Sequence, residues 1–138
     1  MKTILLSLLS IGALVAAEPA KPATAARPGR ALEAPGVRAD FLIQPDRKAT
    51  VTFVDEAGKP VARGDRTMTV KVDGKDVALE AQPNGFITKE PLQAKEPAQI
   101  VVQIRAKADA KPANFRVTLN TSLCGECKRP EYGCVCGH

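Results

Sequence analysis

The chain has 138 residues and a formal net charge of +5, with 44% hydrophobic residues but no Trp and only one Tyr. Positive and negative side chains are well mixed between residues 37 and 119, which excludes the basic stripe with interleaved aromatic residues that nucleic-acid-binding proteins use. The length suits one domain, and its modest core must consist mostly of Val, Ile, Leu and Ala.

The first 17 residues have the pattern of a secretory signal peptide. Lys2 supplies a positive charge, and the apolar stretch from Ile4 to Ala17 is too short to span a bilayer. Small residues close the stretch and predict cleavage before Glu18. The alternative is that this stretch is an uncleaved membrane anchor. We expect a periplasmic or secreted protein that has no membrane span after cleavage.

Residues 18–36 are rich in Pro and Ala and carry scattered charges. The prolines prevent a continuous helix, and few of these side chains are suited to burial. We therefore predict a disordered or semi-extended linker between the signal peptide and the domain.

From residue 37 onward, apolar residues alternate with polar ones, which is the period of half-buried β-strands. Asp73-Gly74 is suited to a tight hairpin, and Asn84-Gly85 marks another turn. Strands are predicted at about residues 37–44, 49–53, 67–72, 77–79, 86–88, 100–104 and 115–119, and an extended segment restarts at Val61. This series of short strands predicts an all-β fold, a single small antiparallel β-sandwich over residues 37–120.

The predicted β domain has no candidate catalytic set. Residues 37–120 contain no His, Cys or Ser. Asp55, Asp73 and Asp76 fall in predicted turns, where Asp is favoured because its side chain bonds the local backbone. Met68 lies on the apolar face of a predicted strand, so we assign it to the core and not to a copper site. We predict that the protein is not an enzyme.

All four cysteines and the only histidine lie in the tail, residues 121–138, with the spacing C-x2-C-x6-C-x-C-x-H. The C-x2-C step lets two thiolates reach one ion, and the six residues that follow are enough to bring the second pair back. Four sulfurs would form a tetrahedral site for zinc or another soft ion such as copper(I) or cadmium. The predicted metal ligands are Cys124, Cys127, Cys134, Cys136 and, as an additional or alternate ligand, His138.

Two other uses of the cysteines stay open. Exported proteins meet oxidising conditions, so two disulfides could staple the tail of a structural or interaction module. A bridge between Cys134 and Cys136 would be strained, which favours metal over disulfides. The third use is redox-active thiols, but no helix is predicted to begin at Cys127, as a thioredoxin-like motif would require.

The tail resembles the short motif C-x-E-H-x-x-P-E-x-x-C-x-x-C of periplasmic adaptor subunits of heavy-metal RND efflux systems. The positions that match are Cys124, Glu126, Pro130, Glu131 and Cys134. Cys127 stands in place of the His of that motif, and Cys136 comes one residue early. The resemblance implies a protein of metal homeostasis whose partners are periplasmic components of an efflux pump.

A second resemblance lies in the β domain. Residues 53–61, F-V-D-E-A-G-K-P-V, are similar to a hairpin of the small β module of those adaptors, and of transthyretin-like and immunoglobulin-like exported modules. The helical hairpin and the lipoyl-like part of an adaptor are missing, and the order of motif and β module is reversed. The resemblance therefore implies an accessory that binds metal and does not transport it.

Overall fold

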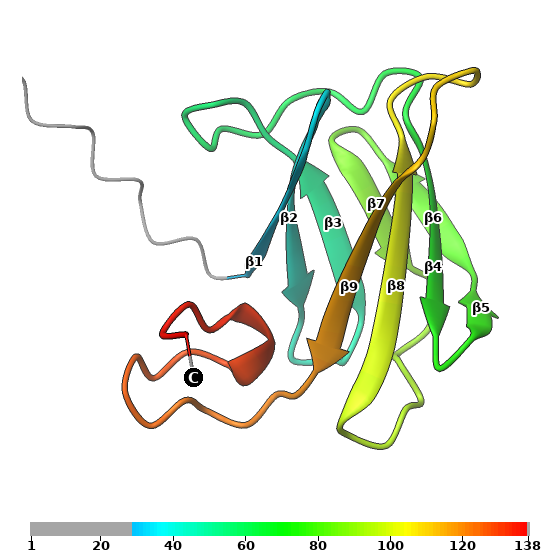
Figure 1. Cartoon of the computed structure of the whole chain (residues 1–138). Coiled ribbons are helices and arrows are strands. Elements are labelled where there is room, and N and C mark those ends of the chain that lie inside the picture. The colour runs from blue at the N-terminus through cyan, green and yellow to red at the C-terminus, as the bar shows by residue number, and fades with distance from the viewer. Residues whose placement is uncertain (1–28, 138) are drawn as a thin grey trace, which may run out of the picture.

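The computed structural model describes residues 29–137, which form two antiparallel β-sheets packed against each other (Figure 1). The elements are β1 (Arg30–Ala34), β2 (Val37–Ile43), β3 (Ala49–Phe53), β4 (Thr67–Val72), β5 (Lys75–Val77), β6 (Leu79–Gln82), β7 (Gly85–Thr88), β8 (Ala98–Arg105), β9 (Ala113–Leu119) and the short 3-10 helix η1 (Glu131–Gly133). One sheet has the order β1-β2-β3-β7-β6 and the other β5-β4-β8-β9. The prediction of an all-β antiparallel sandwich is confirmed.

The period-two pattern of the sequence becomes the two faces of each sheet. In β8, the side chains of Ile100, Val102 and Ile104 are fully buried, while Gln99 and Arg105 on the same strand are exposed. Strands β2, β4 and β9 repeat this alternation and turn their apolar faces inward, whereas β3 also buries Thr50 on its other face. The core therefore lies between the sheets, built mainly from aliphatic side chains as the composition predicts.

The hairpin predicted at Asp73-Gly74 joins β4 to β5. Both turn residues have positive φ, 48° at Asp73 and 81° at Gly74, as a two-residue turn between right-twisted strands requires. The strand predicted at residues 77–79 is in fact two strands. The chain leaves the four-stranded sheet after β5 and joins the five-stranded sheet as β6, with Ala78 between them.

The structure corrects the sequence prediction in two further places. Residues 30–34, predicted to belong to the linker, form the edge strand β1, in which Leu32 is buried opposite Ala39 of β2. The extended segment predicted at Val61 forms no strand, and this region contributes only an isolated bridge between Val54 and Pro60. The remainder of the linker, residues 18–28, and the predicted signal peptide lie outside the described residues.

Within residues 29–137 there is no helix that is both long and apolar enough to cross a membrane. After β9 the chain runs along the end of the sandwich below β1 and β2, where the tail lies in Figure 1. We call residues 120–137 the metal loop. It contains all four cysteines.

Candidate metal centre

The first two cysteines sit at the tip of a narrow hairpin. The backbone N–H of Cys124 donates to the carbonyl oxygen of Arg129 at 2.8 Å, and the N–H of Lys128 donates to the carbonyl of Cys124 at 3.1 Å. An isolated bridge between Leu123 and Pro130 closes the base. Lys128 has a φ of 58°, a left-handed conformation that reverses the chain directly after Cys127. The C-x2-C step thus forms a compact turn that presents two sulfurs to one point.

The second pair of cysteines returns through η1. The N–H of Gly133 donates to the carbonyl of Pro130 at 2.9 Å, and the N–H of Cys134 donates to the carbonyl of Glu131 at 3.1 Å. This single turn aims Cys134 back toward the hairpin. The N–H of Cys136 then donates to the sulfur of Cys134 at 3.4 Å, which folds the last described residues over the cluster.

The four sulfur atoms lie within 4.8 Å of one another. The Sγ atoms of Cys124 and Cys136 are 4.0 Å apart, and those of Cys127 and Cys134 are 3.7 Å apart. A zinc ion with four bonds to sulfur of about 2.3 Å places its ligands about 3.8 Å from one another, the edge of a tetrahedron of that size. The cluster therefore has the size and the donor set of a four-thiolate site for a soft metal ion.

The thiols differ in acidity because different groups surround them. The backbone N–H groups of Cys127 and Glu126 donate to the sulfur of Cys124 and lower its pKa to about 6. For Cys134, the N–H of Cys136 acts to lower the pKa, but burial and the neighbouring thiols outweigh it and raise the pKa overall. The pKa of Cys136 is raised as well, first by its contact with the thiol of Cys134. A bound cation would favour the thiolate form of all three.

Tyr132 attaches the metal loop to the sandwich. Its side chain is only 3% exposed, and its hydroxyl oxygen accepts a hydrogen bond from the backbone N–H of Ile43 at 3.0 Å. Its ring meets that of Phe41 edge to face, with centroids 6.0 Å apart. The backbone of Tyr132 is held as well, because its N–H donates to the carbonyl of Asn120 at 3.1 Å. The turn that delivers Cys134 is therefore fixed by the core.

Next to Tyr132, the backbones of Gly133 and Gly29 approach each other closely. A Cβ atom on Gly133 would come within 3.3 Å of the carbonyl oxygen of Gly29, so this position favours a residue without a side chain. Arg129 donates from Nη2 to the same carbonyl oxygen at 3.1 Å. The start of β1 and the metal loop are thus joined at one corner of the domain.

The strand-to-loop junction is held by Glu96. Its carboxylate accepts hydrogen bonds from the backbone N–H of Thr121 at 2.7 Å and from the Thr121 hydroxyl at 2.8 Å, and it forms a 2.7 Å ion pair with Arg47. The N–H of Thr121 foremost, helped by Arg47, holds the pKa of Glu96 below its ordinary value of 4.5. The chain entering the metal loop is therefore tied to the connection between β7 and β8.

The structure brings Cys124, Cys127, Cys134 and Cys136 together, as predicted, while His138 lies outside the described residues. The sequence did not predict the role of Tyr132 in placing the loop. Its one visible signal is that it is the only tyrosine of the chain and lies in the segment between the two cysteine pairs, two residues before Cys134.

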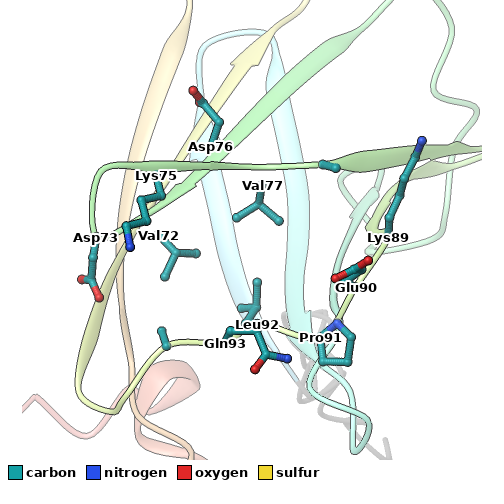
Figure 2. Close-up of a pocket in the computed structure, with 12 residues that line it drawn as sticks. Val72, Asp73, Lys75, Asp76, Val77, Lys89, Glu90, Pro91, Leu92 and Gln93 are labelled. Atoms are coloured by element: carbon teal, nitrogen blue, oxygen red, sulfur yellow. The ribbon is translucent and has the colours of Figure 1, made fainter.

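A separate concave feature is a cavity of about 410 Å³ at the β5 edge of the sandwich. Figure 2 shows Val72, Val77 and Leu92 on its walls, with the charged side chains of Asp76 and Lys89 at its rim. Its lining has no His, Cys or Ser. In Figure 1, β5 lies on the opposite side of the molecule from the metal loop. The chemistry that the described residues offer is therefore concentrated in the four thiols.

Comparisons of the chain with protein-family models, with curated proteins and with solved structures found no match. The geometry of the cysteine cluster therefore carries the functional conclusion.

Proposed function

We propose that this protein is an exported, non-enzymatic metal-binding accessory that holds one soft metal ion, zinc or another such as copper(I) or cadmium, in its metal loop. The observation that carries the proposal is the cluster of four cysteine sulfurs within 4.8 Å of one another. Protein thiolates in such a set suit soft cations, and four of them complete a tetrahedral shell. His138 is a further candidate ligand.

The surroundings of the cluster support binding of a metal. Two N–H groups point at the sulfur of Cys124 and favour its thiolate form before any ion arrives. The anchored turn at Tyr132 reduces the chain entropy that binding has to overcome. Both features lower the free-energy cost of assembling the site.

The export of the protein and its association with metal efflux are part of the same proposal. They are supported by the N-terminal pattern of residues 1–17 and by the resemblance of the tail to the cysteine motif of efflux adaptors. In this role the protein would buffer metal ions in the periplasm or pass them to pump components.

Metal analysis combined with thiol counting on one anaerobic preparation of the full chain tests the proposal. We expect stoichiometric metal in the wild-type protein and its loss in Cys124→Ser and Cys134→Ser. Val135→Ala is the matched control, because it alters the same loop without removing a sulfur and should keep the metal. Metal-free protein with four reactive thiols would refute the proposal.

The same preparation distinguishes a disulfide-stapled interaction module. Cys124 and Cys136 form one close pair of sulfurs, and Cys127 and Cys134 form the other, so oxidation could join them in that pairing. A stapled tail would show no metal, no free thiols and an intact mass lower by about four hydrogens. A thiol oxidoreductase would instead show disulfide-reductase activity toward insulin.

A further inference from the structure

The four sulfur ligands are enclosed by the protein to different degrees. Cys124 is fully buried, Cys127 and Cys134 are half-buried, and Cys136 is exposed. Val135, between the last two cysteines, is 79% exposed, so this arm of the loop faces solvent. An ion held by the cluster would be covered on the Cys124 side and approachable on the Cys136 side.

The backbone hydrogen bonds also hold Cys124 more firmly than Cys136. Moving Cys124 away from the ion would break the two hydrogen bonds that form the hairpin, to Arg129 and from Lys128, and would open the buried side of the loop. Moving Cys136 would break its N–H contact to the sulfur of Cys134. That movement leaves the hairpin, η1 and the contacts of Tyr132 in place.

We infer that Cys136 is the exchangeable ligand, through which the ion passes to an acceptor molecule that carries a thiol, while Cys124, Cys127 and Cys134 retain the ion until the acceptor has bound. This inference rests on the proposed metal binding. It adds the direction of transfer and the chemical class of the partner.

The exchange step is a ligand substitution without oxidation or reduction. The sulfur of the incoming thiol forms a bond to the ion as the bond between the ion and Cys136 breaks. The proton of the incoming thiol passes to the sulfur of Cys136, so the centre keeps four thiolates and the same charge. The same substitution at Cys134, and then at Cys127 and Cys124 of the hairpin, would complete the transfer.

Zinc serves as the probe ion, glutathione as the incoming thiol, and a coloured zinc chelator as the final acceptor. For the zinc-loaded wild-type chain, we expect the transfer rate to rise with glutathione concentration. Cys136→Ser should still bind zinc but should pass it to the chelator at least about tenfold faster, because loss of even an outer-shell partner weakens metal binding about 10- to 100-fold. Cys127→Ser, which removes a half-buried hairpin ligand, is the matched control and should bind zinc more weakly than Cys136→Ser.

A second measurement needs no variant. Zinc-loaded wild-type protein is treated briefly with iodoacetamide, and the modified cysteines are located by peptide mass spectrometry. Cys136 should be alkylated first. Modification of Cys124 or Cys127 before Cys136, or equal loss of zinc affinity in Cys136→Ser and Cys127→Ser, would overturn the inference while leaving metal binding established. Wild-type protein that binds none of zinc, copper(I) and cadmium would overturn both.

Discussion

Tyr132 and Ile43 are joined by a hydrogen bond of 3.0 Å that links the metal loop to the last residue of β2. The bond connects a segment built around cysteines with a strand that contains none. The metal loop therefore has an attachment to the sandwich that does not depend on the state of its thiols. This contact predicts that the turn carrying Cys134 stays in place when metal is removed.

Tyr132→Phe removes the hydroxyl acceptor but keeps the ring against Phe41. We expect it to cost about 1 kcal/mol of unfolding free energy, the usual net contribution of one hydrogen bond. Tyr132→Ala also removes the buried ring and should cost about 3–5 kcal/mol. Denaturant unfolding of metal-free protein measures both losses. If Tyr132→Ala unfolds at the same denaturant concentration as the wild type, the anchor is not supported.

Lys128 has a φ of 58°, which a side chain makes unfavourable. Lys128→Gly should therefore be more stable than Lys128→Ala by about 1 kcal/mol, because only Gly adopts this conformation freely. Both variants lose the 2.6 Å contact between the Lys128 ammonium and the carbonyl of Gly125, so their difference isolates the backbone effect. Thermal unfolding of the metal-loaded proteins compares them. Equal midpoints would show that the hairpin tolerates the left-handed residue without strain.

Glu96 should contribute to the acid sensitivity of the protein. Because its pKa is lowered in the folded state, its stabilisation is present above the ordinary value of 4.5 and is lost as the pH falls through the folded-state pKa. Glu96→Gln should therefore be less stable than the wild type at neutral pH, and the difference should shrink in acid. Unfolding free energies measured across the acid range test this. Glu90→Gln, which changes an exposed residue of the same connection, is the control and should behave like the wild type throughout.

Metal binding should release protons. The raised pKa values of Cys134 and Cys136 keep these thiols protonated at neutral pH, whereas Cys124, with a pKa of about 6, is already largely a thiolate. The apparent affinity for zinc should consequently rise with pH between about pH 6 and pH 8. Titration calorimetry in two buffers of different ionisation enthalpy counts the protons released. A pH-independent affinity would contradict this assignment of protonation states.

The sequence predicted those strands whose signal is local. In β8, alternation of Ile100, Val102 and Ile104 with less apolar neighbours reports burial directly, because successive side chains of a strand face opposite sides. The edge strand β1 has only one buried apolar residue, Leu32, and its extended form depends on pairing with β2. This pairing is a local hairpin through Pro35-Gly36, in which Gly36 has a φ of 76°, but a single buried apolar residue gives too little alternation to predict a strand.

The candidate site also has one part that local sequence predicts and another part that it does not. The four cysteines lie within 13 residues of sequence, so turn chemistry alone was enough to predict that they converge. The contact between Tyr132 and Ile43 joins residues 89 positions apart, and nothing near Tyr132 in the sequence specifies its partner. The change of sheet at Ala78 is also set by a non-local contact, because β6 pairs with β7, and β7 joins the five-stranded sheet by pairing with β3.

The carbonyl oxygen of Gly29, the residue before β1, accepts a hydrogen bond from Arg129, and Gly133 approaches the same backbone. Since β1 is the outer strand of the five-stranded sheet, these contacts cover part of an edge that would otherwise be open to pairing with another chain. Displacement of the metal loop would uncover that edge. Loss of the loop's order is therefore expected to favour pairing of this edge with a second chain, so the loop that gathers the thiols also protects the edge of the sheet.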